Sequence, residues 1–209
     1  EEAAMCEPAA VALHSVGQGN VQIGDTVAVF GAGPIGIMLA LWSKTAGAAK
    51  VILCDIDQTK VDFAKSLGLT AVNSRENDPV AFIKEETGGR GADVCIEGAG
   101  VSQTFEQALK SAKADGHVVC MGNPAGDMTL TQNGYWEILR KQLTVRGTWN
   151  SSYNGEKNDW KTALHAIATH QVDVRPLISH RFHLSEQEKA FGVILGHKEF
   201  FNKVMFVND

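Results

Sequence analysis

The sequence has 209 residues, of which 44% are hydrophobic and 21% charged, an ordinary composition for a globular protein that buries a substantial core. Its formal net charge of −5 argues against nucleic acid as a partner, because phosphates need a positive face. No apolar run is long enough to span a bilayer, and the opening Glu1-Glu2 lacks the basic start of a secretory signal, so no membrane partner is expected.

The four cysteines fit a reducing, cytoplasmic setting. Cys54, Cys95 and Cys120 stand in apolar runs typical of buried strands, and no C-x-x-C pair occurs. Neither a disulfide framework nor a structural zinc site is therefore expected within this sequence. The sequence has no initiator Met and opens in a helical pattern, so we expect it to be a fragment of a longer chain.

Predicted helices and strands alternate along the first 148 residues. A helix over 7–16, with Pro8 as its first residue, precedes a buried strand over 26–30 and a helix over 35–45. The elements predicted next are strand 51–54, helix 59–67, strand 71–72, helix 79–86, strand 92–96, helix 102–113, strand 118–121, helix 135–140 and strand 143–145. Strands this apolar are buried on both faces of a parallel sheet. Right-handed crossovers then make the fold a doubly wound α/β sheet of the Rossmann type.

The pattern changes near residue 149. A polar loop follows over 150–158, and after it we predict helix 159–170, an irregular or extended piece over 175–182, helix 186–195 and strand 203–207. We therefore predict a domain boundary here, with residues 1–148 as one domain and 149–209 as a second unit.

A glycine motif follows the first strand. Gly31, Gly33 and Gly36 form G-x-G-x-x-G between that strand and the next helix, the context of a dinucleotide-binding loop. Gly31 permits the tight turn, Gly33 lets the backbone approach a pyrophosphate, and Gly36 lets the helix pack close to the strand. Around Pro34 and Ile35 the helix N-terminus offers free N–H groups and a positive dipole end to phosphates.

Asp55 ends the next strand, where it would accept hydrogen bonds from the hydroxyls of the adenosine ribose. With Asp57 nearby and no Arg beside it, a 2′-phosphate would be repelled, which predicts NAD rather than NADP. Two other interpretations stay open. The glycines could form a plain strand–helix turn with Asp55 as a helix cap, or the loop could hold the nucleoside of a methyltransferase. The complete fingerprint favours a dinucleotide over both.

With these residues the chain resembles the zinc-dependent medium-chain alcohol dehydrogenases, over nearly its whole length. The resemblance is carried by Glu7-Pro8, by the run from Gly24 to Gly36, by Cys54-Asp55, by the run from Gly91 to Glu97 with Gly100, and by Gly122 and Gly147. The Glu7-Pro8 opening resembles the sorbitol and threonine dehydrogenase branch, and residues 147–152 resemble galactitol-1-phosphate dehydrogenases.

The resemblance implies a function and a division of the chain. The parent enzyme would transfer a hydride between a secondary alcohol of a polyol or polyol phosphate and NAD, with zinc as the Lewis acid. Residues 1–148 would be the NAD domain, with 1–20 leading in from a catalytic domain outside this sequence, and 149–209 would return to that domain. The isolated fragment is expected to be inactive, and the parent a homodimer or homotetramer. A non-catalytic nucleotide-binding module remains the alternative.

The resemblance also implies further site residues. Lys60 would lie near the adenosine ribose, while Gly122-Asn123 and Thr148-Trp149 would hold the nicotinamide carboxamide. The plainer interpretations, a solvated lysine and ordinary turns, stay open.

Glu7 would lie at the catalytic zinc of the parent enzyme, although a carboxylate at a helix start is also favoured by the helix dipole alone. One carboxylate cannot hold zinc, so no metal is expected in this fragment. His14, His180 and His183 are expected to have structural roles. The tryptophans expected in the core or at an interface, rather than stacked on substrate, are Trp136, Trp149 and Trp160.

Overall fold

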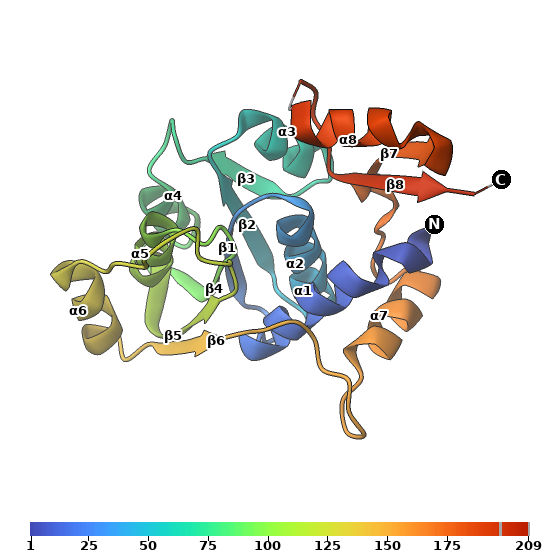
Figure 1. Ribbon diagram of the computed structural model, residues 1–209. Helices are drawn as coiled ribbons and strands as arrows, with labels where there is room; N and C mark the ends of the chain where they lie inside the picture. Colours follow the sequence, from blue (N-terminus) through green and yellow to red (C-terminus); the bar gives the residue numbers. More distant parts are fainter. Residues whose placement is uncertain (197, 209) are drawn as a thin grey trace.

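The computed structural model describes residues 1–196 and 198–208. Six parallel strands form one sheet in the order β3-β2-β1-β4-β5-β6, with helices on both faces (Figure 1). The strands are β1 Thr26–Phe30, β2 Lys50–Asp55, β3 Thr70–Asn73, β4 Ala92–Glu97, β5 Ala112–Cys120 and β6 Thr144–Gly147. The prediction of a doubly wound, Rossmann-type sheet is confirmed.

Three of the six helices around this sheet begin at a side-chain cap. They are α1 Cys6–Gln18, α2 Pro34–Thr45, α3 Gln58–Ser66, α4 Pro79–Glu86, α5 Ser102–Ser111 and α6 Gln132–Arg140. Asp57, Asp78 and Thr131 each accept a hydrogen bond from a first-turn N–H, of α3, α4 and α6 respectively. These local signals explain why the helix starts could be predicted to within a few residues.

Several predicted boundaries were wrong, with the largest error at the junction of α5 and β5. A 3-10 turn over Glu2–Met5 runs into α1, so Pro8 is the third residue of that helix rather than the first, a position where the missing backbone N–H of proline leaves no helix hydrogen bond unmade. Helix α5 ends at Ser111 instead of 113, and β5 begins at Ala112 instead of 118. The polar residues at the start of β5 hid the strand, which pairs with β4 from Ala92 onward.

The two faces of the sheet carry separate hydrophobic clusters. Val27 and Val29 of β1 pack with side chains of α1, α2 and α7, whereas Ala28 and Phe30 pack with side chains of α4 and α5. Burial of an apolar side chain of this size contributes roughly 1.5–3 kcal/mol. Strand β1 is buried at all five positions because helices cover both faces of the sheet there.

Beyond β6 the chain forms α7 Asp159–Ala168, β7 Ile178–His183, α8 Gln187–Gly196 and β8 Lys203–Val207, with 3-10 turns at Arg175–Leu177 and Leu184–Glu186. Strands β7 and β8 pair in parallel as a small second sheet, and α7 packs beside α1 (Figure 1). Ala166 and Ile167 of α7 belong to the same cluster as Val27 and Val29, so buried packing continues past residue 149. Among the described residues, no helix is both long and apolar enough to cross a membrane.

Candidate functional site

The glycine motif lies at the carboxyl edge of the central sheet. Gly31 takes a φ of +111°, a conformation that glycine adopts without strain. A Cβ on Gly36 would collide with the carbonyl oxygen of Gly31, so glycine is required where α2 folds back against the loop. A Cβ on Gly33 would meet nothing within 4 Å, which leaves open space in front of the N-terminus of α2. The loop geometry therefore fits the roles predicted for these three residues.

Asp55 ties this loop to the adjoining turn. One of its carboxylate oxygens accepts the N–H of Ala32 at 2.7 Å, and the other accepts the N–H of Asp57 at 2.9 Å. The alternative of Asp55 as a helix cap is wrong, because α3 is capped by Asp57. Hydrogen bonding from Thr59 and the nearby charge of Lys60 hold the pKa of the Asp57 carboxyl below its ordinary value. Two carboxylates thus stand at the end of β2.

A cavity of about 430 Å³ opens beside this turn, and we call it the adenosine-side cavity after the part of the cofactor that the sequence analysis expects there. Gly31, Gly33, Asp55 and Lys60 line it, together with apolar side chains that include Ile56. Lys60 therefore lines the same cavity as Asp55.

A second cavity, of about 300 Å³, lies near the start of α1, and we call it the nicotinamide-side cavity after the part of the cofactor that the resemblance implies there. Glu7 and Ser15 of α1, Ile35 of α2, Asn123 after β5, and Thr148 with Trp149 after β6 contribute to its lining. The structure thus brings Asn123, Thr148 and Trp149 together. Gly122 does not line either cavity, and a Cβ there would collide with the backbone N of Gly100.

Sequence reasoning assigned no role to Glu97, whose side chain lies at the end of β4 and is 2% exposed. One carboxylate oxygen accepts the N–H groups of Ala99 and Gly100, each at 2.8 Å, and the hydroxyl of Thr104 at 2.7 Å. Glu97 therefore holds the turn after β4, which lines the adenosine-side cavity. A charged residue that ends an apolar strand was the available signal.

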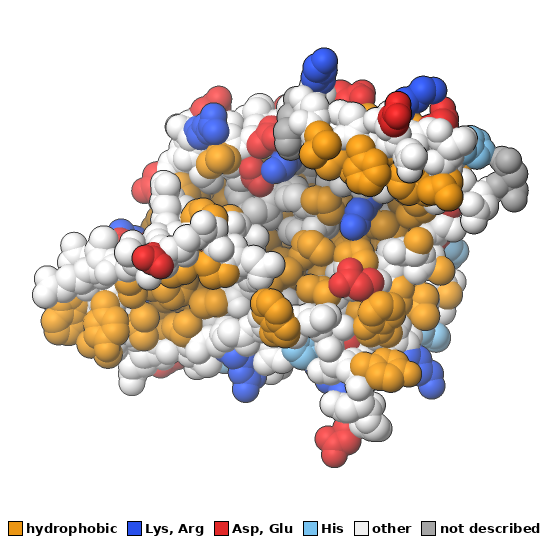
Figure 2. Space-filling model, viewed as in Figure 1, with side chains coloured by type: hydrophobic (Ala, Val, Ile, Leu, Met, Phe, Trp, Pro, Cys, Tyr) orange, Lys and Arg blue, Asp and Glu red, His pale blue; other side chains and the backbone are white. Residues whose placement is uncertain are grey.

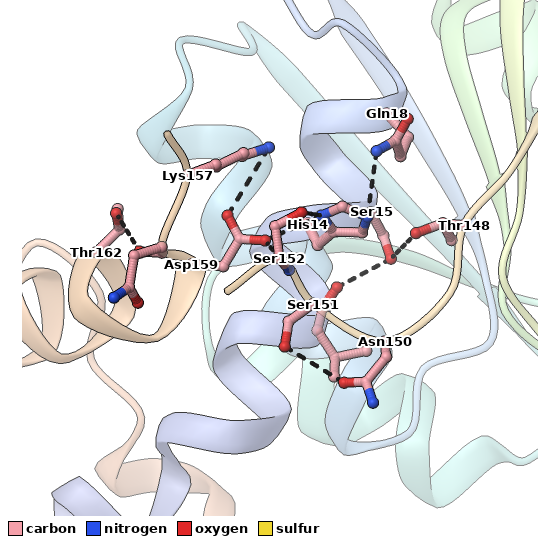
Figure 3. A network of polar contacts seen from close by, with 12 residues as sticks. His14, Ser15, Gln18, Thr148, Asn150, Ser151, Ser152, Lys157, Asp159 and Thr162 are labelled. Carbon is pink, nitrogen blue, oxygen red and sulfur yellow. Dashed lines mark hydrogen bonds and ion pairs between the residues drawn. The ribbon is translucent and has the colours of Figure 1, made fainter. Parts of the chain in front are cut away.

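Histidines and acidic residues do not cluster as a metal site: in 1–196 and 198–208, no three His, Cys, Asp or Glu side chains are placed to hold an ion. Glu7 is exposed and reaches the nicotinamide-side cavity. His180 stacks on Phe182, in line with a packing role. His14 is part of a polar network with Asp159 (Figure 3).

Three tryptophans were expected in the core or at an interface, and the core part of that prediction was wrong. Trp149 is 80% exposed, Trp136 41% and Trp160 38%. The buried tryptophan is instead Trp42 of α2, whose indole N–H donates to the Ala9 carbonyl at 2.9 Å. Figure 2 shows hydrophobic side chains gathered on the surface over α6, where Tyr135, Trp136 and Leu139 are exposed.

Comparison with known proteins gives one family and several relatives. Residues 34–169 match the family model described as zinc-binding dehydrogenase. Sorbitol dehydrogenase 1 of Saccharomyces cerevisiae is 31% identical over 204 residues, which cover 94% of this chain and 55% of that enzyme. The chain spans about half the length of the curated relatives it matches.

Solved structures of similar proteins have the same fold as this chain. Galactitol-1-phosphate dehydrogenase from Escherichia coli superposes with a TM-score of 0.84 at 30% identity, covering 95% of this chain and 58% of that one. A protein from Sinorhizobium meliloti 1021, solved with NADP bound, gives a TM-score of 0.82 at 31% identity, covering 97% and 57%.

Proposed function

This chain belongs to the zinc-binding dehydrogenase family, and on that premise we propose that it binds NAD as the cofactor-binding part of a polyol or polyol-phosphate dehydrogenase. The observation that carries the proposal is the position of two cavities about the N-terminus of α2. Gly33 lines the adenosine-side cavity and Ile35 lines the nicotinamide-side cavity, with only Pro34 between them. A dinucleotide has the matching shape, two nucleoside halves joined by a pyrophosphate that a helix N-terminus attracts.

On the adenosine side, Asp55 and Lys60 would bind the ribose hydroxyls. The carboxylate already accepts two backbone N–H groups, which fixes its orientation, and its remaining lone pairs can accept from a ligand. A 2′-phosphate would meet Asp55 and Asp57 together, which supports NAD over NADP despite the NADP held by one structural relative.

On the nicotinamide side, Asn123, Thr148 and Trp149 would hold the carboxamide and orient the ring. NAD supplies the hydride chemistry when bound, and these residues position it. Among the described residues, Glu7 is the one carboxylate that lines this cavity, and it would approach a zinc ion held mainly by residues outside this sequence. The chain alone would therefore bind cofactor without turning over an alcohol.

We extend the proposal to domain organisation, location and assembly. Residues 1–148 would form the NAD domain and 149–209 a segment that returns to the catalytic domain of the parent. Four unpaired cysteines are compatible with a cytoplasmic setting. The exposed edge strand β6, beside the apolar surface of α6, would pair with a second copy to give a homodimer, or two such dimers a homotetramer.

Titration calorimetry of the purified chain with NADH and NADPH tests cofactor binding. NADH should bind at least about tenfold more tightly, a difference of ~1.4 kcal/mol. Equal affinities would contradict the role of Asp55. A folded chain that binds neither NADH nor ADP-ribose would overturn the proposed function as a whole.

A further inference from the structure

We propose that the pair formed by His14 and the buried Asp159 positions the loop that lines the nicotinamide-side cavity, so that both are positioning residues for the nicotinamide end of the cofactor. The inference rests on the proposed binding of NAD and adds residues that touch neither cofactor nor substrate. His14 belongs to α1 and Asp159 begins α7, 145 residues apart in the sequence.

Asp159 closes the far end of this loop, which we call the 148–159 loop. Its side chain is 2% exposed, and one carboxylate oxygen accepts from His14 Nδ1 at 2.9 Å and from the N–H of Ser152 at 2.7 Å. The backbone N–H of Asp159 donates in turn to the Ser152 carbonyl at 2.9 Å. The Lys157 ammonium lies 3.8 Å from the second oxygen. A buried carboxylate with these partners is costly to disturb, because losing one leaves charge without compensation.

His14 can serve this carboxylate while neutral. Its Nδ1 faces Asp159, and its Nε2 lies 3.2 Å from the side-chain nitrogen of Gln18, one turn further along α1. An imidazole with its proton on Nδ1 donates to the carboxylate and accepts from Gln18. The Ser152 hydroxyl lies 3.3 Å from the same Nδ1, so the ring contacts the loop as well as Asp159 (Figure 3).

The next residue of α1 holds the near end of the same loop. Ser15 is fully buried, and its hydroxyl donates to the Val11 carbonyl at 3.0 Å and lies 3.4 Å from the Thr148 hydroxyl. Thr148 is also fixed to β5 through its N–H, which donates to the Cys120 carbonyl at 3.0 Å. Helix α1 thus anchors the 148–159 loop at both ends, through Ser15 and His14 (Figure 3).

The anchored loop contributes Thr148, Trp149 and Asn150 to the nicotinamide-side cavity and nothing to the adenosine-side cavity. The 153–158 part of the loop is held by hydrogen bonds of its own, whereas residues 149–151, which adjoin the cavity, have few contacts with the rest of the described chain. Trp149 is 80% exposed, and Ser151 accepts the indole N–H of Trp160 at 2.9 Å. Loss of the His14–Asp159 pair should therefore loosen one half of the cofactor site and leave the other intact.

A comparison of NADH with ADP-ribose, which lacks the nicotinamide, tests this division. His14→Ala and Asp159→Asn should weaken NADH binding about tenfold and change ADP-ribose binding by less than about twofold. The matched control is Asp93→Asn, which removes another buried carboxylate that binds Arg90, Lys113 and the N–H of Thr26. It lines neither cavity, so the ratio of the two affinities should not change. Equal weakening of both ligands in the His14 and Asp159 variants would overturn the proposal.

Hydrogen exchange on the unaltered chain tests the same proposal without relying on the folding of any variant. NADH should slow amide exchange at Thr148 and Ser152 by about tenfold, and ADP-ribose should not. NADH binding with no added protection at either amide would overturn the positioning role. Failure of the proposed function is distinguishable, because the unaltered chain would then bind neither ligand.

Discussion

The two halves of the proposed cofactor site are built in opposite ways. Much of the adenosine side comes from one stretch of chain, residues 30–60, in which a glycine loop, a strand end and Asp55 lie within one β-α-β unit. The nicotinamide side is gathered from Glu7, Ile35, Asn123 and Thr148, which meet only because α1 and α2 pack together and β6 ends beside them. Local backbone geometry therefore places the glycine loop and Asp55 on the adenosine side, where the turn after β4 completes the cavity, whereas long-range packing assembles the whole nicotinamide side.

The largest effect should come from the glycine loop. Gly36→Ala puts a Cβ against the Gly31 carbonyl oxygen, so we expect a loss of roughly 1–3 kcal/mol in the free energy of unfolding and NADH binding below detection. Gly33→Ala is the matched control, since its Cβ meets nothing within 4 Å. That variant should keep the stability of the unaltered chain and lose only cofactor affinity. Thermal unfolding of both variants, with and without NADH, separates loss of stability from loss of cofactor affinity. Equal destabilisation by Gly36→Ala and Gly33→Ala would contradict the different roles assigned to the two glycines.

Assembly offers the next test, because β6 is both the sheet edge and the strand that leads into the 148–159 loop. The N–H of Thr148 faces β5, so by the alternation of a strand the N–H of Val145 faces the free edge. Val145→Pro should convert a dimer to a monomer in sedimentation and leave ADP-ribose affinity within about twofold. Arg146→Pro, which removes an inward donor, should instead damage the sheet. An unaltered chain that sediments as a monomer at micromolar concentration would rule out edge pairing.

The difference between the two halves also explains what the sequence could predict. Roles could be predicted for Gly31, Gly33, Gly36 and Asp55 from their spacing relative to one strand and one helix. These residues are close in sequence, so their arrangement in the fold depends mainly on local backbone geometry. Asn123 and Thr148 could be assigned only through resemblance to a family. The contact between His14 and Asp159 had no sequence signal, because neither residue belongs to a local motif. The distance between their side chains depends on how α7 packs on α1.

Other errors have the same physical origin. The first six residues of β5 include Lys113, Asp115 and Gly116, which are unfavourable in an isolated strand, yet the paired β4 edge draws Ala112 into the ladder. A tryptophan is expected to be buried because its side chain is large and mostly apolar. Trp149 is exposed instead, because it lies on a loop whose conformation is held by polar contacts of Thr148 and Ser152.

A moderate effect is expected at Asp55. Asp55→Ala removes the carboxylate that repels a 2′-phosphate and the acceptor for the N–H of Ala32, so NADH affinity should fall while the NADH-to-NADPH ratio narrows from about tenfold towards one. Asp57→Asn is the control, because its amide oxygen can still cap α3 while one charge is lost. Calorimetry with both cofactors gives the ratio directly. A ratio that stays tenfold in Asp55→Ala would place cofactor choice elsewhere.

The smallest effect is expected at Lys60, a residue of the adenosine side, and it tests whether that side is independent of the nicotinamide side. Lys60 lines the adenosine-side cavity from the first turn of α3, and within residues 1–196 and 198–208 the charge of Asp57 is the one interaction that the structure shows for its ammonium. A flexible, partly solvated cation of this kind contributes at most about 1 kcal/mol to an interaction at the surface. Lys60→Ala should therefore weaken NADH and ADP-ribose by the same factor, about threefold at low salt, with less loss as salt is raised. The ratio of the two affinities should stay constant, whereas the His14 variants should shift it. A Lys60 variant that weakened NADH alone would mean that the adenosine and nicotinamide sides are not independent.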